Sequence, residues 1–132
     1  MTSNFRIAGE IKPDAADWGL ARWVSNPKST GARQLAVLDA TLLPGKGHSF
    51  HKHPDQEEVM YVAAGKVEQW VEREKRILGA GDAVFIPAGV VHATFNVGQD
   101  DARLTVIFSP CVGDGFEAVD VSGEAPWKGL RS

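Results

Sequence analysis

The chain has 132 residues, 43% of them hydrophobic and 23% charged, a composition typical of one folded domain and unlike that of a disordered chain. Its formal net charge is −3 and its lysine and arginine residues are dispersed, which argues against the basic surface that nucleic-acid binding requires. No apolar run approaches the roughly 20 residues of a membrane-spanning helix, and charged residues interrupt the N-terminal segment where a signal peptide would be apolar. We therefore expect a cytoplasmic protein without nucleic-acid or membrane partners.

Residues 1–32 form an expected N-terminal arm, in which glycine, proline and asparagine residues separate short apolar pieces. A short strand is expected at about residues 21–25. Trp18 and Trp23 are large apolar side chains in a segment with little core of its own. We expect them to pack on the main body or on a second subunit, with the lining of a ligand pocket as the alternative.

Segments rich in β-favouring residues then alternate with turn-forming residues, with a turn signal about every ten residues. Strands are expected at residues 33–43, 58–64, 66–71, 83–87, 91–97 and 102–109. The first of these is apolar on both faces, which predicts a strand covered on both sides. The charged run 72–76 is expected at the tip of a hairpin. No window has a helical period, so the pattern indicates an all-β sandwich or barrel.

One segment, residues 45–65, holds three of the four histidines of the chain, followed by two glutamates. These residues are His48, His51, His53, Glu57 and Glu58. In a strand, alternate side chains share a face, so His51 and His53 should point the same way. Two imidazoles beside a carboxylate are typical of a transition-metal site, although the same pattern also occurs in polar loops.

The fourth histidine, His92, lies in a second segment, where it is preceded by Gly81, Pro87 and Gly89 and followed by Asn96. This arrangement resembles the second conserved motif of the cupin superfamily, and the segment of residues 45–65 resembles the first. Together the two motifs cover residues 45–96. The flanking strands, as far as residues 33 and 109, fit the same barrel.

In the first motif, the paired histidines of the family match His51 and His53, and its glycines match Gly45 and Gly65. Its glutamate follows the second histidine at a spacing that varies by one residue, so Glu57 competes with Glu58 for this position. The six residues between Glu58 and Gly65 favour Glu58.

The resemblance implies an all-β double-stranded β-helix, or jelly-roll barrel, formed by a single cupin domain over residues 1–132. Its barrel core is expected at about residues 33–109, with an N-terminal arm at 1–32 and a C-terminal tail at 110–132 that wraps the barrel. The two tryptophans of the arm and the mainly β body fit the dimers that many cupins form, so we expect a symmetric homodimer.

The resemblance further implies that four residues bind one divalent transition metal inside the barrel: His51, His53, Glu58 and His92. Three imidazoles and one carboxylate suit Fe, Mn, Ni, Cu or Zn better than Ca or Mg, which prefer oxygen ligands. An octahedral ion with four protein ligands keeps two positions for water, dioxygen or a chelating ligand.

Cupins include dioxygenases, decarboxylases, isomerases and binding proteins, so the fold does not decide the function. We expect a small metalloenzyme, a dioxygenase or a non-redox isomerase or lyase, that acts on a small metal-chelating metabolite in the barrel. The alternatives are a non-catalytic sensor of a small molecule, and a barrel in which the metal has only a structural role. No separate general base can be identified in the sequence.

Three further residues have expected roles outside this set. His48 is expected on the surface or at the rim of the pocket, Asn96 is expected to form a hydrogen bond near the metal site, and Cys111 is expected to be an inert residue near a turn. The candidate pocket walls, with core packing as the alternative for each, are Met60, Trp70, Phe85, Thr94, Val106 and Phe108.

Overall fold

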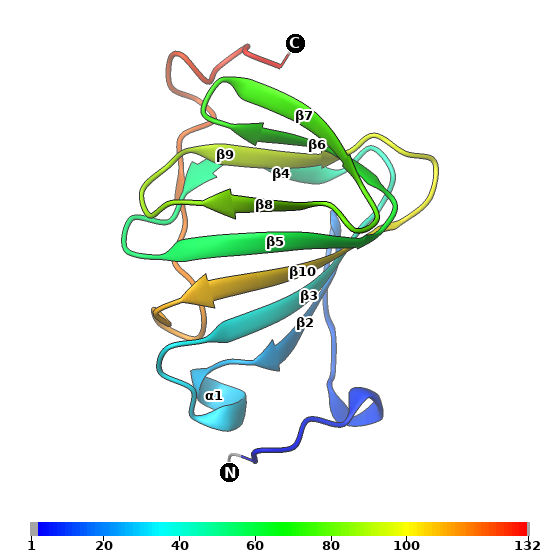
Figure 1. The fold of residues 1–132 in the computed structure, drawn as a ribbon, viewed down its shortest axis with the longest axis vertical. Coiled ribbons are helices and arrows are strands. Elements are labelled where there is room, and N and C mark those ends of the chain that lie inside the picture. Colours follow the sequence, from blue (N-terminus) through cyan, green and yellow to red (C-terminus); the bar gives the residue numbers. More distant parts are fainter. Residues whose placement is uncertain (1–2, 132) are drawn as a thin grey trace.

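The computed structural model describes residues 3–131 and consists of two antiparallel β-sheets that pack against each other as a barrel (Figure 1). Its strands are β1 (Asp14–Ala16), β2 (Gly19–Ser25), β3 (Ala36–Leu42), β4 (Gly47–Lys52), β5 (Glu57–Ala64), β6 (Lys66–Val71), β7 (Glu74–Gly79), β8 (Ala83–Ile86), β9 (His92–Asn96), β10 (Ala102–Ser109) and β11 (Val119–Asp120). A 3-10 helix (Ala8–Glu10) and helix α1 (Pro27–Thr30) lie near the N-terminus. The predicted all-β jelly-roll barrel is confirmed.

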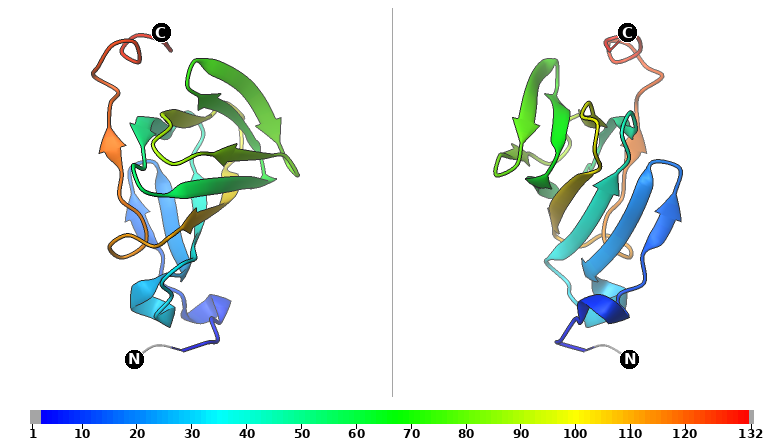
Figure 2. Two further views of the ribbon diagram at one scale, coloured as in Figure 1. Left: turned by 60° about the vertical axis from the view of Figure 1, so that its left-hand side comes forward. Right: turned by 90° about the vertical axis from the view of Figure 1, so that its right-hand side faces the viewer.

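The two segments that flank the predicted barrel core each add strands to a sheet. One sheet has the strand order β1-β2-β3-β10-β5-β8, in which β2 from the N-terminal arm pairs with β3. The other has the order β11-β4-β9-β6-β7, in which β11 from the C-terminal tail pairs with β4. Figure 2 shows the tail, in orange, running along one side of the barrel from the first sheet to the second.

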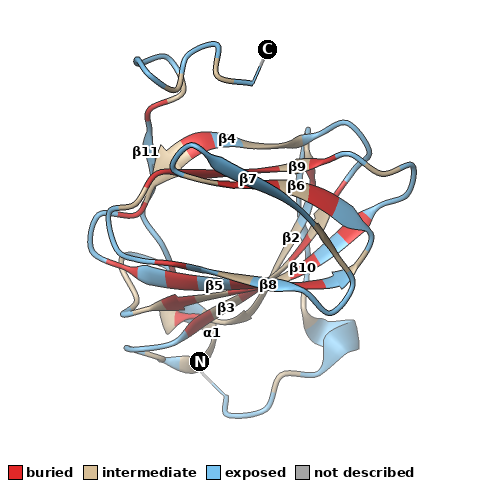
Figure 3. Cartoon of the chain, turned by 45° about the horizontal axis from the view of Figure 1, so that its top comes forward, coloured by how far each residue is buried: buried red, intermediate tan, exposed pale blue. Residues whose placement is uncertain are grey.

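Strand β3 shows how the sequence pattern sets the buried face of the first sheet (Figure 3). Its buried residues are Ala36, Leu38, Ala40 and Leu42. The residues between them are only partly buried, and the outer face carries Asp39, whose carboxylate accepts hydrogen bonds from Arg22 and Arg103 at 2.9 Å. The prediction that this strand is covered on both sides was wrong, because its outer face lies at the surface of a two-sheet barrel.

Two clusters of buried apolar side chains hold the sheets in place. The larger lies between the sheets and consists of Ala36, Leu38, Ala40, Leu42, Met60, Val62, Val67, Ala102, Leu104, Val106 and Phe108. The smaller consists of Phe50, Trp70, Val91, Ala93 and Val121, with Phe95, Trp127 and Leu130 packed against it. Since the tail supplies Val121, Trp127 and Leu130, it covers the second sheet as well as pairing with it.

Several strand boundaries differ from those expected from the sequence. Strand β2 begins at Gly19 and is preceded by β1, so the N-terminal arm contributes a strand pair rather than one short strand. The hairpin between β6 and β7 turns at Glu72 and Arg73, and the rest of the charged run belongs to β7. Among residues 3–131, no helix is long and apolar enough to span a membrane.

Gly65, between β5 and β6, lies where two strands approach closely. Its φ is +90°, and a Cβ added there would lie 2.7 Å from the Cα of Ala102. Gly81 has a similar φ of +93°, but a Cβ added there would have no atom within 4 Å. These two glycines therefore separate the cost of backbone conformation from the cost of a steric clash.

We predict that Gly65→Ala lowers the free energy of unfolding more than Gly81→Ala does. A positive φ costs an alanine about 1 kcal/mol, which both variants share, whereas the overlap with Ala102 should raise the loss at Gly65 to roughly 3 kcal/mol. Urea denaturation of both variants measures the difference. Equal losses would show that the backbone next to Gly65 moves aside without cost.

Candidate metal centre

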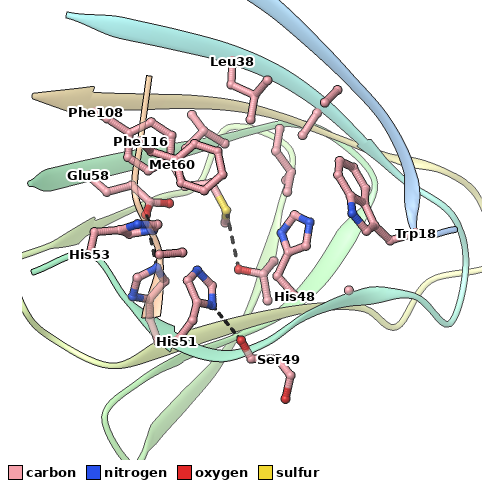
Figure 4. A pocket seen from close by; sticks show the side chains of 18 of the residues that line it. Trp18, Leu38, His48, Ser49, His51, His53, Glu58, Met60, Phe108 and Phe116 are labelled. Carbon is pink, nitrogen blue, oxygen red and sulfur yellow. Dashed lines mark hydrogen bonds and ion pairs between the residues drawn. The ribbon is translucent and has the colours of Figure 1, made fainter. Parts of the chain in front are cut away.

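Four side chains that are distant in the sequence meet between the two sheets. They are His51 in β4, His53 just after β4, Glu58 in β5 and His92 at the start of β9. The Cα atoms of His51 and His92 are partners in the β4–β9 pairing, and their ring centroids lie 4.2 Å apart. The ring of His53 lies 5.0 Å from each of the other two rings. Figure 4 shows His51, His53 and Glu58 side by side. One nitrogen from each of the three imidazoles lies within 4.8 Å of the others, an arrangement that can hold a metal ion.

The register of β5 distinguishes the two adjacent glutamates. Glu57 is exposed on the outer face, whereas Glu58 is only 6% exposed and faces the histidines. The Oε1 atom of Glu58 lies 3.1 Å from the Nε2 atoms of both His53 and His92. Since side chains alternate along a strand, only one of these two glutamates can reach the interior. The carboxylate that meets the histidines is that of Glu58.

Backbone carbonyl groups determine which nitrogen of each imidazole faces the centre. The Nδ1 atoms lie 2.6 Å from the carbonyl oxygen of Ser49 for His51, 2.9 Å from that of Glu117 for His53, and 2.9 Å from that of Val90 for His92. A carbonyl oxygen only accepts hydrogen bonds, so each Nδ1 must carry a proton. In the neutral ring, the lone pair of Nε2 is then left to face the interior.

The centre therefore brings together hydrogen-bond acceptors that have no donor between them. Glu58 Oε1 and His92 Nε2 are buried and have no hydrogen-bond partner among the described residues. Their 3.1 Å separation becomes an ion pair only if a second proton binds the ring. A divalent cation at this point would satisfy every one of these acceptors, so the residues fit a bound metal ion.

The ionisation states of the centre also fit a metal ion. Burial, together with the positive charge that His92 can carry, lowers the pKa of His51 to about 4, so His51 is neutral at pH 7. Burial alone would raise the pKa of Glu58, but the positive charge that the neighbouring His53 and His92 rings can carry outweighs it and lowers that pKa to about 2. A neutral imidazole and an ionised carboxylate are the forms that bind metals.

His48 lies in the cavity because β4 contains a β-bulge. In the pairing of β4 with β9, His48 faces Thr94 and His51 faces His92, so three steps along β4 match two along β9. Without the extra residue, His48 and His51 would point to opposite faces of the sheet. His48 instead reaches the interior, where its ring packs edge-on against Trp18 with centroids 4.5 Å apart. The sequence predicted a surface or rim position because it does not reveal the bulge.

A cavity of about 480 Å³ extends from the centre between the sheets. Of the predicted wall residues, Met60, Thr94, Val106 and Phe108 line it, which confirms their placement. Trp18 and Trp23 also line it, so these side chains face the ligand space rather than the outer surface.

Two predicted wall residues do not reach the cavity. Trp70 belongs to the smaller apolar cluster, because its neighbour Gln69 takes the interior face of β6. Phe85 is 53% exposed, since its Cα is paired with that of the outward-facing Val59. In both cases the alternation of the strand places the side chain on the opposite face.

Asn96 and Cys111 lie away from the centre. The Asn96 amide donates to the carbonyl groups of Leu42 and Asp100, so it stabilises turns at the far end of β9 and does not contact the histidines. The prediction that Asn96 supports the metal site was wrong, because four residues along a strand cover about 13 Å. Cys111 packs against the larger core cluster, where burial raises the pKa of its thiol, as expected of an inert residue.

Gln56 is a contributor to the centre that the sequence did not reveal. It is 2% exposed, and its amide nitrogen donates to the carbonyl groups of Pro110 and Gly115 at 2.7 and 2.9 Å. Its amide oxygen accepts the backbone N–H of Glu117 at 3.0 Å. Because the carbonyl of Glu117 accepts the Nδ1 proton of His53, Gln56 holds in place the group that orients that ring.

We predict that Gln56→Ala releases the tail from His53. In the metal-free protein, nitrogen NMR of the imidazole should show His53 changing from the Nδ1–H form to a mixture of tautomers, because its acceptor is no longer fixed. Zinc affinity should fall about tenfold, as for the loss of other groups that support metal ligands.

Asn26→Ala is a matched control for the Gln56 variant. It removes the hydrogen bond from Asn26 to the carbonyl of Asp114 in the same tail but leaves the Gln56 contacts intact. Asn26→Ala should therefore reduce stability without changing the His53 tautomer. If both variants changed the tautomer equally, Gln56 would have no specific role in orienting His53.

Known proteins resemble this chain in sequence. The model of the Cupin domain family matches residues 38–108. Polyketide synthase CurC of Streptomyces cyaneus is 34% identical over 101 residues, which cover 76% of this chain and 66% of CurC. Protein SchB of Streptomyces halstedii is 32% identical over 101 residues, which cover 76% of this chain and 73% of SchB. The chain thus spans about two thirds of CurC and somewhat more of SchB.

Solved structures share the fold. The structure of KdgF from Halomonas sp. superposes with a TM-score of 0.72 at 24% identity and covers 83% of this chain and 96% of that one. At this identity the likeness concerns the fold alone. The family match covers more than half of the chain and contains His51, His53, Glu58 and His92. This chain belongs to the cupin domain family.

Proposed function

We propose that His51, His53, Glu58 and His92 bind one divalent transition metal ion, and that this ion binds a small molecule through oxygen atoms. The observation that carries this proposal is the meeting of three imidazole nitrogens and one carboxylate, with the orphaned atoms Glu58 Oε1 and His92 Nε2 at its centre. No donor among the described residues satisfies these two atoms, and a cation would.

The set of donor atoms favours Fe, Mn, Ni, Cu or Zn over Ca or Mg. When bound, such an ion supplies Lewis-acid chemistry or, if it is iron, the activation of dioxygen. The chain supplies the rest of the environment. The backbone carbonyls orient the ligand imidazoles, and the two sheets enclose the cavity beside them.

We propose a small metalloenzyme, a dioxygenase or a non-redox isomerase or lyase, with a non-catalytic sensor of a small molecule as the alternative. The similarity to CurC, which is named a polyketide synthase, supports an organic molecule as the ligand. His48 is the one histidine outside the proposed ligand set, and it borders the cavity without a hydrogen-bond partner among residues 3–131.

The cytoplasmic location and the homodimer stay predictions. Trp18 and Trp23 no longer support the dimer, because they face the cavity.

We predict that Glu58→Gln weakens zinc binding at least about 100-fold, because loss of a ligand should cost more than the tenfold to hundredfold loss caused by removing supporting groups. Competition with a chromophoric chelator measures the affinity. Glu57→Gln is the matched control, since its side chain lies on the outer face of the same strand, and it should bind zinc as the unmodified protein does.

The same variant tests a purely structural role of the metal. The larger apolar cluster holds the two sheets together without any group from the centre, so metal-free Glu58→Gln protein should keep its folded circular dichroism spectrum. Unfolding of this variant in the absence of metal would favour the structural role. Loss of zinc binding in Glu57→Gln alone would contradict the assignment of Glu58.

Turnover separates the enzyme from the sensor. Protein purified without oxygen should be analysed for its metal and then tested for oxygen uptake with diketones, phenols and thiols, and for isomerised or cleaved products without oxygen. We expect the unmodified protein to turn over at least one of these classes of compound, and we expect the Glu58→Gln variant to lose this turnover. Binding without turnover across all of them would favour the sensor. Zinc found after ordinary purification would not decide the native metal, because zinc binds such sites more tightly than iron or manganese.

A further inference from the structure

The cavity beside the proposed metal has two chemically different ends. In Figure 4, His53 and Glu58 lie at one end of the cavity and Trp18 lies at the other, and the ring of His48 lies between Trp18 and His51, with centroids 4.5 and 6.4 Å from theirs. Apart from the centre, most of the wall is apolar. It is formed by Trp18, Ala21, Trp23, Leu38, Ala40, Met60, Leu104, Val106, Phe108, Phe116 and Ala118.

Aromatic side chains from separate segments of the chain form much of this wall, and Trp23 contacts Phe116 with ring centroids 5.8 Å apart. Trp18 and Trp23 come from the N-terminal arm, one just before β2 and the other within it. Phe108 of β10 and Phe116 of the tail stack with ring centroids 5.1 Å apart, and both rings also contact His53. Flat apolar surfaces of this kind pack well against the faces and edges of a ring.

No lysine or arginine lines the described cavity, so its wall offers no fixed positive charge. Its carboxylates are those of Glu58 and Asp120. A dicarboxylate would therefore find one cation, the metal, and would leave any further negative charge near Asp120 without a partner.

The polar groups of the wall away from the centre are few. The Thr94 hydroxyl is already engaged, since it donates to the amide oxygen of Gln69 at 2.5 Å. The Ser122 hydroxyl is likewise engaged with Asp120. The imidazole of His48 has no hydrogen-bond partner among residues 3–131, so it is available to one polar atom of a ligand.

From these observations, and resting on the proposed metal centre, we infer that the cavity selects a ligand with at most one negative charge, one oxygen-chelating head and an apolar, ring-sized body. The head binds the metal at the histidine end, and the body packs along the apolar wall as far as Trp18. A cavity of about 480 Å³ has room for such a body, whereas a two-carbon diacid would leave most of it unfilled.

Hydroxamic acids of increasing size test this inference, because they share one chelating head. Zinc-loaded protein is titrated calorimetrically with acetohydroxamic, benzohydroxamic and 2-naphthohydroxamic acid, and with oxalate as a small dianionic chelator. We expect benzohydroxamic acid to bind about tenfold or more tightly than acetohydroxamic acid, since the added ring is buried on the wall. Oxalate should bind more weakly than benzohydroxamic acid.

Two tryptophan variants test whether the added ring of the ligand packs against Trp18. Trp18→Ala removes part of the far wall and should reduce the gain from the added ring to about threefold or less. Trp127→Ala is the matched control, because Trp127 stacks on Phe50 outside the cavity and should leave the gain unchanged. Zinc content and the thermal unfolding midpoint confirm that each variant is folded and loaded.

The possible failures are distinguishable. The proposed metal centre would be overturned if the unmodified protein bound no zinc, or if the Glu58→Gln variant bound zinc as tightly as the unmodified protein does. Zinc-loaded protein that binds no hydroxamic acid would show that the ion is closed to ligands. Three results would overturn the inference about the ligand while leaving the metal centre intact. They are equal affinity across the hydroxamic series, tighter binding of oxalate than of benzohydroxamic acid, and a Trp18→Ala variant in which the added ring still raises the affinity as much as in the unmodified protein.

Discussion

The centre of this barrel depends on three hydrogen bonds from imidazole Nδ1 atoms to backbone carbonyl groups. Each bond leaves an Nε2 lone pair facing the same point, where the carboxylate of Glu58 also lies. Acceptors of this kind repel one another unless a cation or protons lie between them. The fold therefore maintains an arrangement that is unfavourable when empty, and this cost is offset when a metal binds.

The three carbonyls come from different parts of the chain, which ties distant segments to the centre. Those of Ser49 and Val90 lie two residues before the histidines they orient, within or next to the same strands. That of Glu117 lies in the tail, held there by Gln56, whose own position between His53 and Glu58 is set by the first motif. The tail is thus part of the centre, although no residue in it is a proposed ligand.

Residues outside the two motifs differentiate this site within a family whose fold supports many functions. Trp18 and Trp23 from the N-terminal arm and Phe116 from the tail form much of the aromatic wall. The motifs provide the metal chemistry, whereas these flanking segments determine what fits beside it. The absence of basic side chains from the described wall is as informative as the aromatic ones that are present, because it argues against multiply charged ligands.

Local pattern was sufficient for the all-β class and most strand positions, and the resemblance to the two cupin motifs added the four residues that meet in the centre. Strand alternation and motif spacing are properties of neighbouring residues, so they can be read from the chain alone. The choice of Glu58 over Glu57 followed from the spacing of the first cupin motif, in which six residues separate Glu58 from Gly65. The same reasoning did not decide the positions of Trp70 and Phe85, since composition does not show which face of a strand lines the cavity: Trp70 lies in the core, as the alternative had it, and Phe85 is exposed.

Only the tertiary structure placed His48 in the cavity, Asn96 at a distant turn and Gln56 behind His53. The position of His48 depends on an extra residue in β4 relative to β9, and a bulge is a property of two paired strands rather than of either sequence. Gln56 acts on residues more than fifty positions away, so its partners are defined only once the tail has crossed the barrel. The sequence by itself indicated which residues gather in the centre, because their chemistry and their spacing match the two cupin motifs. The tertiary structure decided how these residues are oriented and what surrounds them, because both depend on contacts between segments far apart in the chain.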